Sequence, residues 1–325
     1  MTIKILNYVL LALLSGLGLL VTAFTLVPQS RDSILSNAQV VDSIYSGPLI
    51  AATTGMETAW DIPKSPLTDS LLPADKHLAE QIKLGYEYFT NTPRSVKQFS
   101  GNKLSCSNCH LNAGQRENAL PLVGVGGVFP EYNKRQGRLI SLEDRIVGCF
   151  ERSMNSTGVK KNGKRHIVRP STEAKEILAL SSYITWLSSG YAIGEKIPWR
   201  GHNVISSNKL LPIEKLDAKV GEKLFMEHCS TCHGEDGQGV EIGDKIAGPL
   251  WGPNSWNDGA GAARVYTLAG MIRPMMPYLN PGSLTDEEAQ HIAAFITSKP
   301  RPKYPFKASD YRTEPLPVDA VYYKR

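Results

Sequence analysis

The pattern Cys-x-x-Cys-His occurs twice in this 325-residue chain, and it limits what the chain can fold around. The two copies are Cys106-Ser-Asn-Cys109-His110 and Cys229-Ser-Thr-Cys232-His233. The pattern is the attachment site of a c-type haem, because two thiols add to the two vinyl groups of one porphyrin and the adjacent histidine reaches the iron. A redox-active Cys-x-x-Cys or half of a zinc site would need a further partner at suitable spacing. Two complete copies therefore predict two covalently bound haem c groups.

The N-terminus is strongly apolar and predicts export. Residues 5–27 are almost wholly apolar, with Lys4 before them and Arg31 after them. This pattern fits a secretory signal peptide, for which Val21-Thr-Ala23 resembles a small-residue cleavage site, or an uncleaved membrane anchor. The apolar run is long enough to span a bilayer, which favours the anchor. In both cases we expect the rest of the chain in the periplasm, either soluble or held at the inner membrane by this helix.

The charge of the chain is moderate, with a net +5 at neutral pH and a pI of about 8.8. A nucleic-acid-binding module would show a dense basic stripe, and the sequence has none, so we expect no nucleic-acid partner. The local basic run from Lys160 to His166 is expected to be a solvated loop. The modest positive field would still attract small anions or an acidic protein partner.

Hydrophobic spacing predicts a pair of helices around each motif. The first unit would have helices over residues 76–89 and 173–187, and the second over 218–228 and from the capping box Thr285-Asp-Glu-Glu288 onward. The first helix of each pair carries Gly-x-x-x-Phe, at Gly85 and Gly221, and a glycine there lets the closing helix approach closely. Each unit thus runs helix, Cys-x-x-Cys-His, long loops, closing helix. This order is typical of cytochrome c. It predicts a mainly α fold of two tandem cytochrome c-like domains, each binding one covalent haem c, after an N-terminal hydrophobic helix.

The expected boundaries follow from this order and from the composition of the stretches between the helices. They are 1–30 for the signal peptide or anchor, 31–73 for an N-terminal extension, 74–200 for the first cytochrome c domain, 201–212 for a linker, 213–300 for the second domain and 301–325 for a C-terminal tail. The copies differ in one place: Phe89 precedes Cys106 by 17 positions, whereas Phe225 precedes Cys229 by 4. The first unit therefore carries an insertion beside its haem and is the modified copy. The tail shows no pattern that predicts a structure.

A haem iron held by one histidine needs a second axial ligand or keeps an open position. In the second unit the candidate is the string Arg273-Pro-Met-Met-Pro277. Its two prolines are expected to hold the chain extended and to block a helix, so that a thioether is presented rigidly. We favour Met276 over Met275 as this ligand, while a pair of core methionines is the alternative interpretation.

The first unit lacks such a string, and three side chains are candidates for its sixth ligand: Cys149, Met154 and His166. Ser141 and Asp144 resemble a helix start, after which Arg145, Cys149 and Ser153 fall on one helix face. We expect a thiol flanked by guanidinium groups and near a ferric iron to be ionised, hence a good ligand and nucleophile. A buried structural cysteine is the alternative, and the spacing leaves both interpretations open. The other four cysteines are used by haem, so Cys149 has no intramolecular partner.

Together these motifs resemble the dihaem thiosulfate dehydrogenases of the periplasm. The resemblance covers roughly residues 76–300, and the string Cys149-Phe-Glu-Arg-Ser-Met-Asn155 is its most specific part. The axial ligands that it implies are His110 and Cys149 on a first, catalytic haem and His233 and Met276 on a second, electron-transferring haem. Met275 stands where some members have a lysine that can also bind the second iron. Its presence argues for simple His/Met ligation.

The family reaction, which the resemblance implies for this chain, couples two thiosulfate ions into tetrathionate with loss of two electrons, or runs in reverse. The implied roles are catalysis for Cys149, substrate binding for Arg135 and Arg145, and a place in the same pocket for Ser153. Two dianions repel each other, and arginine forks would neutralise them, with Arg138 and Arg152 as further candidates. The cysteine would form a covalent thiosulfonate that a second thiosulfate resolves. A cytochrome c-type partner would accept or donate the electrons.

Other interpretations come from different classes of protein. A non-catalytic dihaem electron-transfer cytochrome c is the main alternative, and it predicts Met154 or His166 as the ligand in place of Cys149. A cytochrome of a sulfur-oxidising complex would share the chemistry but would need a carrier-protein partner. A dihaem peroxidase is disfavoured, since nothing in the sequence marks a separate peroxide site.

Overall fold

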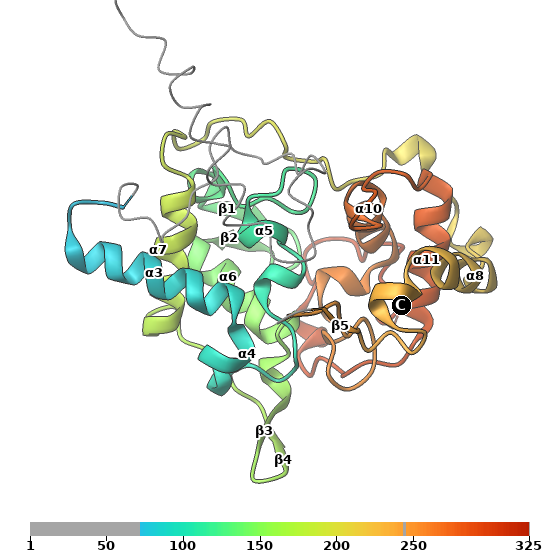
Figure 1. The fold of residues 1–325 in the computed structure, drawn as a ribbon, viewed down its shortest axis with the longest axis horizontal. Coiled ribbons are helices and arrows are strands. Elements are labelled where there is room, and N and C mark those ends of the chain that lie inside the picture. Colours follow the sequence, from blue (N-terminus) through green and yellow to red (C-terminus); the bar gives the residue numbers. More distant parts are fainter. Residues whose placement is uncertain (1–71, 243–244, 325) are drawn as a thin grey trace, which may run out of the picture.

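The computed structural model describes residues 72–242 and 245–324. The N-terminal helix that the sequence predicts, whether signal peptide or anchor, lies outside the described residues, as does nearly all of the extension. No helix in the described part of the chain is both long and apolar enough to cross a bilayer. The described residues form two mainly helical units that lie side by side (Figure 1), as the repeated pattern predicts.

The first unit consists of five helices and two short strand pairs. Its helices are α3 Lys76–Thr90, α4 Thr92–Ser95, α5 Leu111–Gly114, α6 Leu142–Arg152 and α7 Lys175–Leu187. Its antiparallel strand pairs are β1 Glu131–Asn133 with β2 Arg138–Ile140, and β3 Val159–Lys161 with β4 Lys164–His166. Short 3-10 turns occupy Lys97–Phe99, Cys106–Asn108, Val125–Val128 and Ser156–Gly158. The insertion beside the first haem motif, which the second unit lacks, contains α4.

The second unit repeats the helix order of the first. Its helices are α8 Ala218–His228, α9 Ser230–His233, α10 Val265–Met275 and α11 Asp286–Ser298. A short antiparallel pair joins β5 Glu241–Ile242 to β6 Lys245–Ile246, and 3-10 turns occupy Ser207–Lys209, Ile213–Lys215, Gly261–Ala263 and Lys307–Ser309. α11 begins with the predicted capping box, in which Thr285 Oγ1 accepts from the Glu288 N–H at 3.2 Å. The Glu288 carboxylate accepts from the Thr285 N–H at 2.7 Å, which completes the box.

The same helix crossing builds both units, with α3 against α7 and α8 against α11 (Figure 1). A Cβ atom on Gly85 would overlap the carbonyl oxygen of Ala179 in α7. A Cβ atom on Gly221 would likewise overlap the carbonyl oxygen of His291 in α11. The predicted role of both glycines is therefore confirmed, and the predicted helices agree with α3, α7 and α8 to within two residues.

The interior of each unit forms around the phenylalanine that follows this glycine. Phe89 packs against Tyr183 with ring centroids 5.6 Å apart, and Phe225 packs against Phe295 at 5.4 Å. All four rings are at most 2% exposed. Burying such a side chain stabilises the fold by about 1.5–3 kcal/mol. Each ring pair holds the two crossing helices of its unit together, and the haem motif follows the first of these helices.

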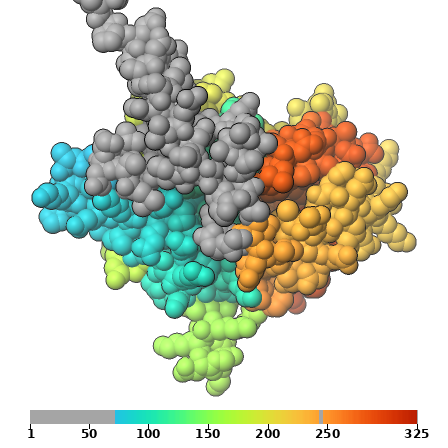
Figure 2. Space-filling model, in the orientation of Figure 1, coloured from blue at the N-terminus to red at the C-terminus, as the bar shows by residue number. Residues whose placement is uncertain are grey.

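Two segments differ in detail from the sequence-based expectation. α10 runs through Pro274 and ends at Met275, so the prediction that both prolines block a helix is wrong for Pro274. Met276 is extended and is followed by a cis peptide bond to Pro277. The basic run 160–166 is exposed as expected, but it forms most of the β3–β4 hairpin, which projects from the body of the first unit (Figures 1 and 2).

The C-terminal tail, residues 301–324, packs across both units, although the sequence predicts no structure for it. Asp310 forms an ion pair with Arg152 of α6 in the first unit, at 2.7 Å. Asp319 forms an ion pair with Arg264, just before α10 in the second unit, also at 2.7 Å. The tail therefore connects the two units by charge pairs as well as by the covalent chain.

Candidate functional site

A backbone carbonyl holds the histidine of each motif. His110 Nδ1 donates to the carbonyl oxygen of Leu120 at 2.6 Å, and His233 Nδ1 donates to that of Ala247 at 2.5 Å. A carbonyl can only accept, so Nδ1 carries the proton and Nε2 keeps its lone pair. Burial lowers the pKa of His110 to about 4 and also lowers the pKa of His233. Both imidazoles are therefore neutral, as an iron ligand must be.

The motif cysteines complete the donor set for haem c. None of the four forms a disulfide within the described chain, and each motif folds as one turn in which the histidine N–H donates to the carbonyl of the first cysteine, at 3.0 Å in the first motif and 2.9 Å in the second. Burial raises the pKa of Cys106 to about 12, of Cys109 to about 11 and of Cys229 to about 12. Buried protonated thiols are poor redox groups. Two neighbouring thiols and a neutral imidazole instead fit covalent attachment of one haem c in each unit.

Cys149 lies beside the first motif, on helix α6, which begins at the predicted helix start, where Ser141 and Asp144 form a capping box. One turn apart on this helix, Arg145 Nη1 donates to Cys149 Sγ at 3.1 Å. Burial is the main cause of the raised pKa of Cys106 and Cys109, and the charge of Cys149 raises both further. The thiol and the guanidinium that the sequence singled out thus share one site with the first haem motif.

The two other candidates for the sixth ligand of the first haem have different surroundings. His166 is exposed in β4 of the projecting hairpin. Met154 is 4% exposed and belongs to the apolar core that includes Phe89 and Phe150. Cys149 interacts electrostatically with Cys106 and Cys109, whereas His166 lies in the projecting hairpin.

The arginines that the sequence suggested for substrate binding differ in their partners. Arg138 pairs with Asp144 through two hydrogen bonds of 2.9 and 3.1 Å, and Arg152 pairs with Asp310 inside the protein. Carboxylates therefore neutralise both of these guanidinium groups. Arg145 is exposed and has no carboxylate partner within the described chain. Its charge is thus available to an anion.

Arg135 and Ser153 are connected to this site in different ways. Arg135 lies between β1 and β2, where its Nη1 donates to the carbonyl of Gly259 and its Nε donates to the Tyr311 hydroxyl at 3.3 Å. Ser153 follows α6, and its N–H donates to the carbonyl of Cys149 at 2.7 Å. Hydrogen bonds therefore join Ser153 and Arg145 directly to Cys149, whereas those of Arg135 lead to the second unit and the tail.

Two residues at the first motif and its surroundings were not assigned a role from the sequence. Thr92, in α4, is fully buried and its hydroxyl accepts from the Cys106 N–H at 3.2 Å. The one feature of the sequence that points to Thr92 is the insertion in which it lies. Tyr311 orients Arg135 and lies with its ring centre 5.6 Å from that guanidinium. The two residues are 176 positions apart, so no spacing rule could have found the pair.

Met275 and Met276 also have different surroundings. Met275 is 4% exposed and packs against Leu111 and Ala119 of the first unit. Met276 touches this cluster, but it is only partly buried and also packs against the main core, which extends through both units. A sulfur enclosed by apolar side chains of the other unit is poorly available to the second iron. This packing favours Met276 as the ligand.

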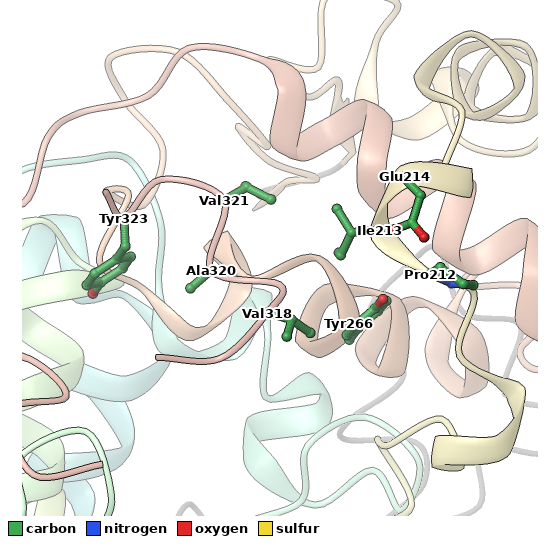
Figure 3. Close-up of a pocket in the computed structure, with 8 residues that line it drawn as sticks. All are labelled: Pro212, Ile213, Glu214, Tyr266, Val318, Ala320, Val321 and Tyr323. Atoms are coloured by element: carbon green, nitrogen blue, oxygen red, sulfur yellow. The ribbon is translucent and has the colours of Figure 1, made fainter. Parts of the chain in front are cut away.

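The cavity in Figure 3 is separate from the haem motifs. Its volume is about 590 Å³, and it lies between the linker, α10 and the tail, with Ile213, Tyr266, Val318 and Val321 in its walls. None of the described residues that line it is a cysteine, histidine or arginine. The cavity therefore lacks the cysteine and histidine that would hold a haem c, and none of its described lining residues is a cation for an anionic substrate.

Comparison with family models divides the chain as the fold does. A model described as SoxA/TsdA, cytochrome c domain, matches residues 96–193. A second model, described as Cytochrome C oxidase, cbb3-type, subunit III, matches residues 216–296. The two matches cover the first and the second Cys-x-x-Cys-His motif respectively.

Known proteins resemble the chain over both units. A thiosulfate dehydrogenase of Allochromatium vinosum is 39% identical over 242 residues, which are 72% of this chain and 83% of that protein. A thiosulfate dehydrogenase of Stutzerimonas stutzeri is 35% identical over 235 residues, 72% of this chain and 71% of that protein. The solved structure of thiosulfate dehydrogenase (TsdBA) from Marichromatium purpuratum, in its "as isolated" form, is 33% identical with a TM-score of 0.67. That match covers 80% of this chain and 56% of the other, so this chain spans little more than half of that protein.

Proposed function

This chain belongs to the thiosulfate dehydrogenase family of dihaem c-type cytochromes, and we propose that it couples two thiosulfate ions into tetrathionate, or runs that reaction in reverse, at Cys149. The observation that carries this proposal is the 3.1 Å hydrogen bond from Arg145 to Cys149 beside the first Cys-x-x-Cys-His motif. A nucleophile, a cation and a redox cofactor would thereby meet in one place.

Two covalently bound haem c groups are the cofactors. The residues that we propose to hold the first are Cys106 and Cys109 by thioether bonds and His110 and Cys149 as axial ligands. Those proposed for the second are Cys229 and Cys232 by thioether bonds and His233 and Met276 as axial ligands. When bound, the two groups supply the one-electron acceptors that a two-electron sulfur oxidation needs.

The chain's own residues would carry the sulfur chemistry. Arg145 stabilises negative charge on the Cys149 sulfur, and Arg145 and Arg135 offer cationic forks to sulfonate oxygens, which offsets the repulsion between two dianions. Ser153 lines the pocket one turn beyond the cysteine. The Cys149 thiolate forms an S–S bond to the outer sulfur of one thiosulfate as two electrons are lost, leaving a thiosulfonate on the cysteine. A second thiosulfate attacks that adduct, which releases tetrathionate and restores the thiolate.

A periplasmic location and a cytochrome c-type electron partner belong to the same proposal. The apolar residues 5–27 support export, either as a signal peptide or as an anchor in the inner membrane. The exposed hairpin residues 160–166 supply positive surface that would attract an acidic partner protein.

The variant Cys149→Ala tests the proposal. We expect both haems to stay attached, because the four motif cysteines are unchanged, while thiosulfate–tetrathionate conversion is lost and the ferric thiolate charge-transfer band disappears. The pyridine haemochrome assay counts attached haem, and absorption spectroscopy follows the band. Full conversion by Cys149→Ala would rule out the mechanism. A wild-type protein with neither turnover nor a thiolate band would instead be a non-catalytic electron carrier.

A further inference from the structure

Arg116 is a buried cation with no counter-charge among the residues that the structure describes. Its side chain is 6% exposed, and its Nη2 donates to the carbonyl oxygen of Tyr278 at 3.3 Å. The guanidinium carbon lies 4.6 Å from the centre of the Tyr278 ring. Its Nη1 is buried and has no hydrogen-bond partner in the described part of the chain. The neighbouring acid, Glu117, lies beside His202 instead, at 3.7 Å.

An arginine in this position calls for an anion. Its guanidinium stays protonated in proteins, and buried charges in native structures are paired because burying a lone charge is costly. No carboxylate among the described residues forms an ion pair with Arg116. A buried donor without a partner then indicates a group that the described residues do not supply.

The position of Arg116 connects the two units. It belongs to the segment 110–120, which contains α5 and carries both the histidine of the first motif and the carbonyl that holds that histidine. Its partner Tyr278 follows Met276, the proposed ligand of the second haem, by two residues. Two apolar residues of the same segment pack against Met275 of the second unit. Arg116 therefore lies where the surroundings of the two haems meet.

We propose that Arg116 binds a propionate carboxylate of a haem c at this contact. Each haem c carries two propionates, which are ionised at neutral pH, and a guanidinium fork matches a carboxylate. A substrate anion does not fit, because a site covered to this degree does not admit and release a solute at every turnover. The segment belongs to the first unit and Tyr278 to the second, so the test must identify which haem supplies the carboxylate. The inference rests on the two cofactors and not on the proposed sulfur chemistry.

In this role Arg116 is a positioning residue that sets a redox potential. A positive charge near a haem favours the reduced iron, because reduction adds one negative charge to the group. Since Arg116 is buried, its charge acts at low dielectric and is weakly screened by salt. Removing that charge should lower the midpoint potential of the haem whose propionate it binds.

Redox titration of the holoprotein, followed by visible absorption and without thiosulfate, measures both midpoint potentials. Arg116→Gln and Arg116→Met each remove the charge, and the methionine variant retains the apolar bulk should the glutamine variant fail to fold. We expect one midpoint potential to fall in both variants, and the haem that shifts is the one that supplies the propionate. Arg116→Lys, which keeps the charge but not the fork, should shift that potential less. The control Arg200→Gln removes the same charge from an exposed pair with Glu131, and it should leave both potentials unchanged.

Two results would overturn the proposal. The first is wild-type potentials in both neutral variants with both haems attached. The second is a shift no larger than that of Arg200→Gln, since it would reflect net charge alone. Loss of one haem in both neutral variants, but not in Arg116→Lys, would support it. The proposed function can fail independently: if Cys149→Ala retains full conversion while the Arg116 variants shift a potential, this inference stands.

Discussion

Arg145 and Arg138 show how single contacts decide which cation is available to a substrate. Arg138 is exposed, yet Asp144 holds it through two hydrogen bonds. Arg145 donates to the sulfur of Cys149 and pairs with no carboxylate of the described chain. A guanidinium that faces a sulfur keeps further N–H groups for a sulfonate, whereas one paired with a carboxylate has its fork engaged. The partner, and not the residue type, separates these two arginines.

Arg145→Ala should raise the KM for thiosulfate roughly 10- to 150-fold, since a hydrogen bond to a charged group contributes about 1.5–3 kcal/mol. Arg135→Ala should raise the KM as well, and Arg145→Lys should rescue poorly because a lysine lacks the planar fork. Arg138→Ala is the matched control, and should change little because Asp144 already neutralises Arg138. Steady-state kinetics with thiosulfate measure the KM of each variant. Unchanged kinetics in both Arg145→Ala and Arg135→Ala would mean that the pocket lies elsewhere.

Met276→Gly should lower the midpoint potential of the second haem and leave the thiolate band of the first intact, because a thioether ligand raises the potential. Met275→Gly is the matched control: it removes the same group from the cluster of Leu111 and Ala119. It should cost about 2–5 kcal/mol of stability, with the potential unchanged. Redox titration compares the two variants. If only Met275→Gly shifts the midpoint potential of the second haem, the ligand is Met275 and not Met276. If neither variant shifts it, this segment does not supply the ligand.

At the scale of elements, both units use a glycine to bring two crossing helices into close contact. A glycine in a helix interior is usually destabilising by about 1 kcal/mol relative to alanine. In α3 and α8 it lets the closing helix bring its backbone into contact, at Ala179 for Gly85 and at His291 for Gly221. The rings that follow, Phe89 and Phe225, then pack beneath the crossing. The helix pair holds each haem motif in place.

Gly85→Ala and Gly221→Ala should destabilise the protein, although alanine is the better helix former. The added Cβ atom would meet backbone oxygen in the opposite helix, and overpacking of this kind costs about 1–3 kcal/mol. Thermal unfolding of the holoprotein should show a lower Tm for both variants. Glu80→Ala, on the exposed face of α3, is the control and should stay within about 0.5 kcal/mol of the wild type. A raised Tm in both glycine variants would show that the helices separate at little cost.

At the scale of the whole molecule, the C-terminal tail connects the two units through ion pairs with each of them. Asp310 is 2% exposed in its side chain, and it pairs with Arg152 at the end of α6. The Tyr323 hydroxyl donates a further hydrogen bond to Asp310, at 2.5 Å, beside the two from Arg152. Farther along, Asp319 holds Arg264 before α10. The contact of Asp310 with Arg152 lies at the end of α6, the helix that carries Cys149, so the tail helps to set the position of the proposed active site.

Asp310→Asn should destabilise the protein by about 3–5 kcal/mol, because it keeps the shape of the side chain but leaves the Arg152 charge buried and unpaired. Denaturant or thermal unfolding measures the loss. Glu131→Gln is the control, since Glu131 pairs with the exposed Arg200, and it should cost at most about 1 kcal/mol. Equal losses in the two variants would show that the tail does not hold the units together.

Features whose residues lie close along the chain could be predicted from the amino-acid sequence. Haem attachment depends on five consecutive residues, and the helix start at Ser141 and the capping box at Thr285 on four, because covalent bonds and helix hydrogen bonds act over one or two turns. The contact between Arg145 and Cys149 belongs to the same class, since residues four apart on a helix are neighbours. The repeated helix order, and with it the two-domain fold, follows from such local patterns.

Contacts between distant segments depended on how the two units and the tail come together. Arg152 meets Asp310 across 158 positions, and Arg116 meets Tyr278 across 162. A side chain's type states its charge, but its partner is chosen when the whole chain buries its apolar surface. This is why Arg152, which the sequence suggested for substrate binding, forms a structural ion pair with Asp310 in the folded protein. It is also why α10 continues through Pro274: the packing of Met275 against the first unit outweighs the local preference of proline against helix.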